Sequence, residues 1–157
     1  MNYIKWILVF AFGIMTMASF GQDEIKWLTF EEAIAKNKEN PKPIFIDLYT
    51  DWCGWCKKMD ASTFQDEEVV AYMSDNFYTV KFDAEQKEDV EYKGNTFKFV
   101  DQGRRGYHEL AAGLLQGQMS YPSFVVLSQE EKIMQTIKGY RTSEQFLPIL
   151  KALIEKE

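Results

Sequence analysis

Two cysteines separated by two residues, directly after a short apolar run, constrain the fold of this chain more than any other feature. Residues 44–49 read Ile-Phe-Ile-Asp-Leu-Tyr, which is too short for a helix and is typical of a central β-strand buried on both faces. Residues 51–57 follow as Asp-Trp-Cys-Gly-Trp-Cys-Lys, and residues 53–59 are expected to begin a helix. At a helix start this spacing brings both sulfur atoms to one side, within reach of a disulfide bond.

The start of a helix also favours a reactive thiolate. Cys53 is expected at the N-terminus, where unpaired N–H groups and the helix dipole stabilise negative charge, and Lys57 and Lys58 add positive potential about one turn further on. Cys56, inside the first turn, is expected to be the more buried, resolving cysteine. Because these are the only two cysteines, exchange within the chain can run only between them.

Three other roles remain open for the cysteine pair. As a structural disulfide it closes a very short loop, for which chain entropy contributes about 2 kcal/mol, against roughly 4.7 kcal/mol for a 100-residue loop. As a zinc site it lacks ligands, because His108 is the only histidine and there is no second cysteine pair. As a metal-delivery site it predicts tight binding of soft metals by the reduced protein. We expect no metal and no cofactor.

The remainder of the chain alternates between helical and strand patterns. A capping box at Thr29–Glu32 predicts a helix to about residue 37. Further helices are expected over residues 67–74 and 106–116 and after a cap at Thr142 or Ser143, strands over 77–83, 123–128 and 133–138, and a small hairpin turning at Gly94-Asn95. Pro148 is tolerated only near a helix start, which would place the start of the last helix later than its cap suggests.

Composition and charge narrow the class of protein. A chain of 157 residues with this order of helices and strands predicts one α/β domain, whose mixed sheet is covered by helices on both faces. Aromatic residues make up 15% of the chain, which indicates a well-filled core. The formal net charge of −6 disfavours nucleic acid as a partner.

Residues 1–21 have the layout of a secretory signal peptide. Lys5 precedes an apolar stretch over residues 6–18, and small residues occupy positions 19 and 21. The alternative is an N-terminal membrane anchor, although the apolar run is shorter than the ~20 residues that a bilayer span needs. We therefore expect residues 22–157 to form the mature domain, exported to a compartment such as a bacterial periplasm and free of the membrane after cleavage.

Residues 52–57, after the strand at 45–49, resemble the active site of the thioredoxin superfamily. They are closer to exported thioredoxin-like disulfide reductases than to cytosolic thioredoxin, whose middle dipeptide is Gly-Pro. Asp47 falls where the superfamily keeps a buried acid beneath the second cysteine, and Lys81 matches the lysine that pairs with this acid. Tyr121-Pro122 matches the cis-proline loop that faces the cysteines. The resemblance implies a three-layer α/β/α fold with an insertion, at about residues 88–119, before the proline loop.

The resemblance also implies a reaction. Cys53 would attack a disulfide in a partner protein, and Cys56 would release the reduced partner. Asp47, assisted by Lys81, would handle the proton of Cys56. An Asp among apolar residues is expected to have a raised pKa, unless it faces water at the strand end. For Lys81 the alternative to pairing with Asp47 is a solvent-facing position.

The implied partners are disulfide-containing proteins and an unidentified thiol redox partner. The surface implied for binding them consists of Trp52, Gly54, Trp55 and the Tyr121-Pro122 loop. The middle dipeptide lacks the histidine of strongly oxidising relatives, which favours a reductase over an oxidase. The alternative function is a binding or chaperone-like module that keeps the fold and in which Cys-to-Ser variants remain functional.

Several side chains near the predicted site have two interpretations. Trp55 either forms part of a docking surface or packs against the 88–119 segment. Arg104, Arg105 or Met119 either shapes a partner-binding rim or belongs to an ordinary loop and packing helix. His108 is expected at the surface or half-buried rather than as a catalytic base.

Overall fold

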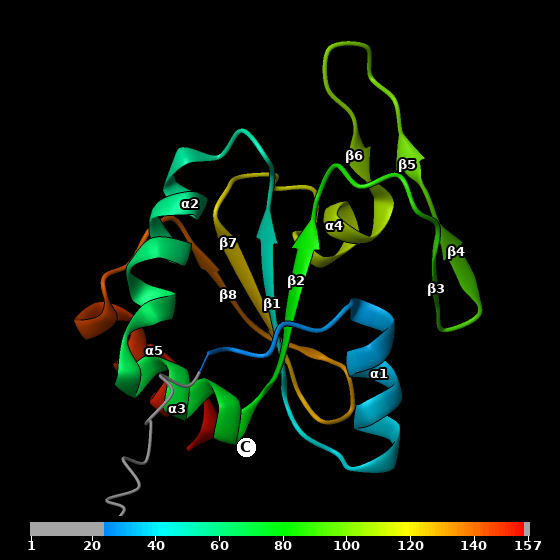
Figure 1. Ribbon diagram of the computed structural model, residues 1–157. Helices are drawn as coiled ribbons and strands as arrows, with labels where there is room; N and C mark the ends of the chain where they lie inside the picture. The colour runs from blue at the N-terminus through cyan, green and yellow to red at the C-terminus, as the bar shows by residue number, and fades with distance from the viewer. Residues whose placement is uncertain (1–23, 156–157) are drawn as a thin grey trace, which may run out of the picture.

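Four strands form the central sheet of the computed structural model, which describes residues 24–155 (Figure 1). Their order is β2 (Tyr78–Asp83), β1 (Ile44–Tyr49), β7 (Ser123–Leu127) and β8 (Ile133–Lys138). β1 and β2 are parallel, whereas β7 is antiparallel to both β1 and β8. The predicted mixed sheet is therefore confirmed. The signal peptide predicted for residues 1–21 lies outside the described residues.

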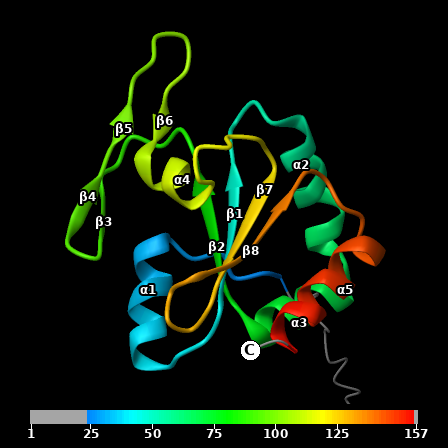
Figure 2. The same ribbon diagram turned by 180° about the vertical axis from the view of Figure 1, so that it is seen from behind.

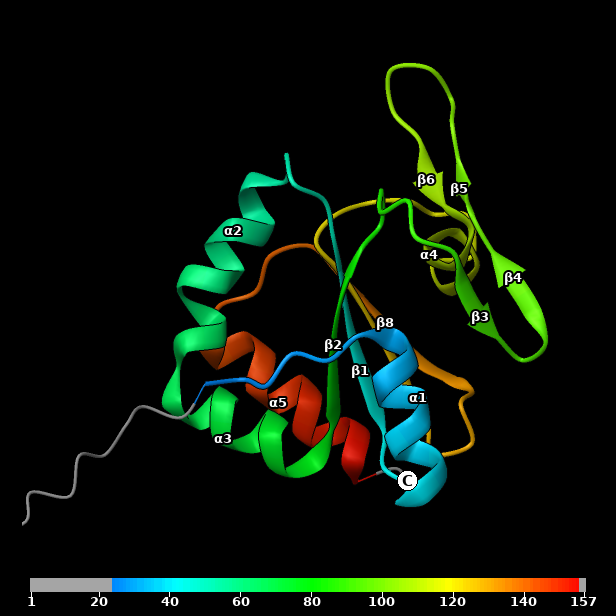
Figure 3. The ribbon, with the colours of Figure 1, turned by 45° about the vertical axis from the view of Figure 1, so that its right-hand side comes forward.

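Helices cover both faces of this sheet, as predicted. α1 (Phe30–Glu39) and α4 (Glu109–Leu114) lie on one face, and α2 (Gly54–Ala61), α3 (Glu67–Asn76) and α5 (Ser143–Ile154) lie on the other (Figure 3). Successive residues of a strand point to opposite faces, so β1 supplies side chains to two separate hydrophobic clusters. Between residues 24 and 155 no helix is both long and apolar enough to cross a bilayer.

The aromatic residues concentrate in the cluster beneath α2, α3 and α5. The Phe45 ring stacks on the Phe124 ring with centroids 5.5 Å apart, and it meets the edge of Phe146 at 5.8 Å. Phe64, from the short 3-10 helix η1 (Thr63–Gln65), packs edge-on against Phe124 at 5.9 Å. These interlocked rings hold η1 and α5 against the sheet.

The helix predicted over residues 106–116 begins later than expected. Tyr107–His108 instead form strand β6, which pairs with β5 (Phe99–Val100), and α4 begins at Glu109. The imidazole of His108 caps this helix, because its Nδ1 accepts the backbone N–H of Leu110 at 3.2 Å. Its Nε2 lies 3.0 Å from the Glu88 carbonyl. The side chain is fully buried, so its expected surface or half-buried position is wrong. Burial is tolerated because both ring nitrogens have partners.

The predicted small hairpin is confirmed as β3 (Val90–Tyr92) and β4 (Asn95–Phe97). Its turn residues are Lys93 and Gly94, one position earlier than predicted, and both have positive φ (51° and 77°). A two-residue turn of this kind needs φ above zero at both positions, which glycine adopts without strain.

The last helix begins at Ser143, so its expected later start is wrong. Thr142 and Gln145 form a reciprocal capping box that fixes the first turn. Pro148 lies inside the helix and leaves the carbonyl of Glu144 without its helical donor. Because Glu144 is exposed, water can hydrogen-bond to this carbonyl. The bounds of the other expected helices and strands agree with the prediction to within two residues.

Candidate redox site at the start of α2

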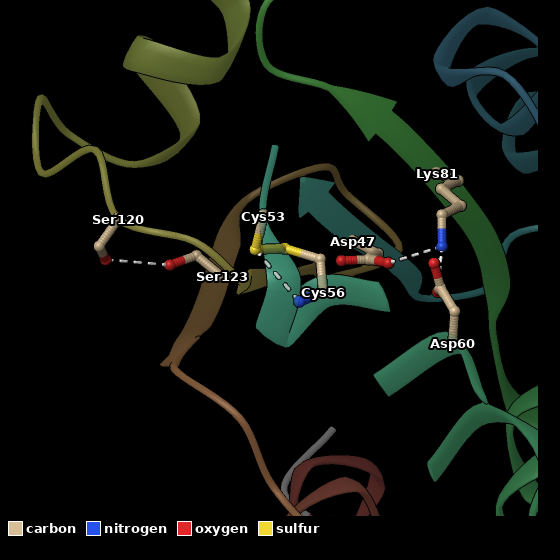
Figure 4. The surroundings of a disulfide bond; sticks show 7 residues. All are labelled: Asp47, Cys53, Cys56, Asp60, Lys81, Ser120 and Ser123. Carbon is tan, nitrogen blue, oxygen red and sulfur yellow. Dashed lines mark hydrogen bonds and ion pairs between the residues drawn. A yellow bond between two sulfur atoms is a disulfide. The ribbon is translucent and has the colours of Figure 1, made fainter. Parts of the chain in front are cut away.

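The two cysteines are joined by a disulfide bond where β1 leads into α2 (Figure 4). Cys53 is the N-cap residue, and its Sγ accepts a hydrogen bond from the backbone N–H of Cys56 at 3.1 Å. The predicted proximity of the two sulfur atoms is thus confirmed. The expected difference in burial is absent, since Cys53 is 4% and Cys56 3% exposed. Both cysteines are therefore buried at the start of α2.

A buried acid lies beside this disulfide. Asp47 points from β1 into the space between the cysteines and Lys81, and it is 1% exposed (Figure 4). Burial raises the pKa of Asp47 to about 7, although the nearby Lys81 ammonium opposes the rise. The alternative that Asp47 faces water is therefore wrong. Within residues 24–155 its Oδ1 has no hydrogen-bond partner.

Lys81 connects this buried acid to a second acid that the sequence analysis missed. It is the register partner of Asp47 in β2, and its Nζ lies 3.3 Å from Asp47 Oδ2. The same Nζ forms an ion pair with Asp60 of α2, whose side chain is 40% exposed. Rings of Trp27 and Tyr49 also face the ammonium group, with centroids 5.0 and 5.2 Å away. Asp60 is four positions after Cys56, and this helical spacing is the signal that could have identified it.

The loop before β7 passes beside the disulfide. The Tyr121–Pro122 peptide bond is cis, and Ser120 and Ser123 on either side share a hydrogen bond of 3.3 Å (Figure 4). The Tyr121 ring meets the Trp52 ring edge-on at 5.9 Å. Burial and the nearby acids raise the pKa of Tyr121 to about 12, so its hydroxyl stays protonated at neutral pH. The predicted proline loop and Trp52 are therefore in contact.

The two exposed tryptophans next to the cysteines, Trp52 and Trp55, pack against different parts of the chain. Trp55 is 56% exposed and packs against Tyr140, with ring centroids 5.3 Å apart, rather than against the 88–119 segment. The alternative that Trp55 packs against the 88–119 segment is therefore wrong. Its partner Tyr140 lies instead in the loop that joins β8 to α5, beside α2. Trp52, 49% exposed, makes the contact with the 88–119 segment instead, through Arg105 at 4.0 Å. A Cβ added to Gly54 would meet no atom within 4 Å, so the backbone between the tryptophans is open.

The other candidate residues divide between surface and core. Arg104 is exposed, whereas Met119 is partly buried against the core cluster beneath α1 and α4. Among residues 24–155 no group of three or more His, Cys, Asp or Glu side chains is arranged to hold a metal ion. The chemistry available at this site is that of the disulfide, the buried carboxyl group and the ion pairs beside it.

Comparisons with known proteins agree with this geometry. The family model described as "Thioredox_DsbH: Protein of unknown function, DUF255" matches residues 16–145. Thiol:disulfide interchange protein DsbD of Yersinia enterocolitica is 39% identical over 74 residues, which cover 41% of this chain and 12% of that protein. This chain spans only a small part, 12% or less, of the length of the first curated relatives it matches.

Solved structures show the same fold at low sequence identity. A structure described as DsbH oxidoreductase has a TM-score of 0.57 and 20% identity, covering 85% of this chain and 87% of its own. A thioredoxin from Thermus thermophilus has a TM-score of 0.64 and 16% identity, covering 85% and 89%. The predicted thioredoxin-like α/β fold is therefore confirmed.

Proposed function

This chain belongs to the Thioredox_DsbH family, and on that premise we propose that it is an exported thiol–disulfide oxidoreductase that reduces disulfides in partner proteins. The observation that carries this proposal is the placement of the only two cysteines at the start of α2, beside a buried acid with a raised pKa. The similarity to DsbD, named as a thiol:disulfide interchange protein, and to DsbH, named as an oxidoreductase, supports it.

The proposed reaction transfers two electrons to the partner. The thiolate of Cys53 attacks one sulfur of the partner disulfide, so that a mixed disulfide forms and the first partner sulfur leaves as a thiolate. The thiolate of Cys56 then attacks the sulfur of Cys53 and expels the second partner sulfur. Cys53 and Cys56 end as a disulfide, and the two partner thiolates take up the two protons that the cysteines released.

The environment of each cysteine fits its role. Cys53 Sγ, at the N-cap of α2, already accepts a backbone N–H, and this bond together with the helix dipole stabilises a thiolate. Asp47, with a pKa of about 7, can take the proton from Cys56 near neutral pH. Lys81 pairs with both Asp47 and Asp60, so its positive charge stabilises the ionised form of the buried acid after proton transfer.

The partner chain would lie across the exposed rim of the site. Trp52, Gly54 and Trp55 form one side of this rim, and the Tyr121-Pro122 loop forms the other. Aromatic side chains bury a large area at low entropic cost, which suits transient docking of an extended segment. A separate dithiol donor would return the Cys53–Cys56 disulfide to its reduced form.

Reduction of insulin disulfides, with dithiothreitol as electron donor, tests the proposed activity. The wild type is expected to be active and Cys53→Ser inactive, whereas Cys56→Ser is expected to accumulate mixed disulfides with partner proteins. A redox titration gives the direction, because a potential near −270 mV indicates a reductase and one near −120 mV an oxidase. An inactive wild type without any trapped partner would overturn the proposal. If the chain that carries both Cys53→Ser and Cys56→Ser remains fully functional, this would support a binding module instead.

Export is the second part of the proposal, and it rests on the apolar pattern of residues 6–18 and the small residues at positions 19 and 21. Intact-mass measurement of the protein from the native cell envelope tests it. A mass that lacks residues 1–21 is expected, with the protein in the periplasm. A mass that still includes residues 1–21 would refute the predicted cleavage.

A further inference from the structure

Arg105 reaches the redox site from a hairpin that lies outside the central sheet. The hairpin consists of β5 and β6 and projects beyond the same end of the sheet as the start of α2 (Figures 1 and 2). Gly106, next to Arg105, packs so closely against Phe99 and the Val100 carbonyl that a Cβ would collide with both. This tight packing fixes the base of the loop that carries Arg105.

The guanidinium group of Arg105 rests against the ring of Trp52, the residue before Cys53. Its central carbon lies 4.0 Å from the ring centroid, which is a close cation–π contact. The contact restrains a long side chain before any partner binds, so less entropy is lost on binding. A guanidinium group held in this way still presents N–H donors that match the two oxygens of a carboxylate.

These donors are not used by the part of the chain that the structure describes. None of the ion pairs over residues 24–155 includes Arg105. Glu85 accepts the indole N–H of Trp52 at 3.0 Å, and Asp83 accepts the backbone N–H of Glu85 at 2.9 Å, so these two acids are held by donors other than Arg105. An acceptor supplied by a bound molecule would meet an unpaired cation beside Cys53.

The surrounding charges restrict where that acceptor can lie. Asp51, Asp83 and Glu85 give this side of the site a negative potential: burial raises the pKa of Asp83, and the charges of Asp51 and Glu85 raise it further. A broadly acidic partner would therefore be repelled. A single carboxylate close to the reacting cysteine would contact Arg105 directly, because Trp52 is adjacent to Cys53 and also touches Tyr121 of the proline loop.

We propose that Arg105 is a specificity-determining residue, which favours disulfide substrates that carry a carboxylate within about two residues of their cysteine. The inference rests on the proposed function, because it concerns the same reaction at the same cysteines. Two sources of this chemistry exist, an acidic side chain in a polypeptide and the carboxylates of a small disulfide such as glutathione disulfide.

The test uses the reduced full-length chain and synthetic peptide disulfides that differ only next to the cysteine, which is flanked by Glu, Gln or Lys. The rate of release of peptide thiol is measured by chromatography, and the Glu-to-Gln rate ratio is taken within each variant, so that a general loss of activity cancels. For the wild type at low salt the ratio is expected to be about five, the size of a solvent-exposed charge pair. High salt should reduce it.

Arg105→Gln is expected to bring the ratio to about one, and Arg105→Glu to make the Lys peptide the fastest. Arg104→Gln is the matched control, because it removes the same charge from the same loop and Arg104 has no contact with Trp52. It should keep the preference for Glu. A ratio of one in the wild type, or equal losses in the Arg104 and Arg105 variants, would overturn the inference.

Glutathione disulfide, measured in parallel, identifies the source of the carboxylate. Dependence of its rate on Arg105 assigns a small disulfide as a substrate, whereas dependence confined to the peptides assigns a polypeptide, and both results support the proposal. If no disulfide reacts with the wild type or with any variant, the proposed function itself fails. If the Glu and Gln peptides react at equal rates, only the inference about Arg105 fails.

Discussion

The buried carboxyl group of Asp47 should make the stability of this protein depend on pH. Its pKa is about 7 in the folded chain against an ordinary value of 3.8, so between these values the folded chain holds a proton that the unfolded chain has released. The free energy of unfolding must therefore fall as pH rises through this window. The total cost is about 4 kcal/mol above pH 7, since one pKa unit corresponds to about 1.4 kcal/mol. Below pH 3.8 both states are protonated and the cost vanishes.

Asp47→Asn removes this titration while it keeps the size of the side chain. Lys81 retains Asp60 as an ion-pair partner in the variant, so no buried cation is left alone. We expect the stability of the variant relative to the wild type to increase by about 3 kcal/mol between pH 5 and pH 8. Urea unfolding of the oxidised proteins at several pH values measures this difference.

Asp75→Asn is the matched control, because Asp75 is an exposed residue of the same type, at the far end of α3. Its curve of stability against pH should follow that of the wild type. Parallel curves for the wild type and Asp47→Asn between pH 5 and pH 8 would refute the assignment of a raised pKa to this carboxyl group.

Three further predictions concern single side chains. Lys81→Met removes the cation that opposes the effect of burial, so the pKa of Asp47 should rise further, as measured by NMR titration of its carboxyl carbon; a lower pKa would contradict this. His108→Ala leaves the Glu88 carbonyl and the Leu110 N–H without their partner and should cost about 2–4 kcal/mol in urea unfolding. Phe124→Ala removes the ring stacked on Phe45 and should cost about 3–5 kcal/mol in the same assay, and a cost below 1 kcal/mol for either substitution would contradict the packing described.

Features encoded by short-range spacing could be predicted from the sequence. The Cys53–Cys56 contact follows from one turn of helix, and the burial of Asp47 follows from the apolar residues on both sides of it. The pairing of Asp47 with Lys81 needed the resemblance to thioredoxins, because strand register depends on residues far apart in the sequence. Local patterns were sufficient for the elements of the site and for the chemistry of its cysteines.

Features that depend on tertiary packing were missed or misplaced. The apolar spacing from Tyr107 onward fits a helix, yet residues 107 and 108 pair with β5 because His108 finds both of its partners only as a buried cap. Asp60 was missed, and Arg105 was only one of three candidates for a partner-binding rim; both reach the site through contacts that depend on how α2 and the β5–β6 hairpin are oriented. Exposed charged residues give no apolar pattern that would indicate such contacts.

Stability alone does not explain the acid beneath Cys56. A buried ion pair is often replaced by apolar residues without loss of stability, and Asp47 carries the further cost of a pKa raised to about 7. A carboxyl group with this pKa changes its proton occupancy at neutral pH, which a proton acceptor for Cys56 requires. Lys81 moderates the cost without removing it, because burial raises the pKa of Asp47 more than the ammonium lowers it, and the charge of Asp60 raises it further. The proposed role of Asp47 as proton acceptor would account for this cost, and Asp47→Asn is then expected to gain stability at pH 8 while slowing release of the partner by Cys56.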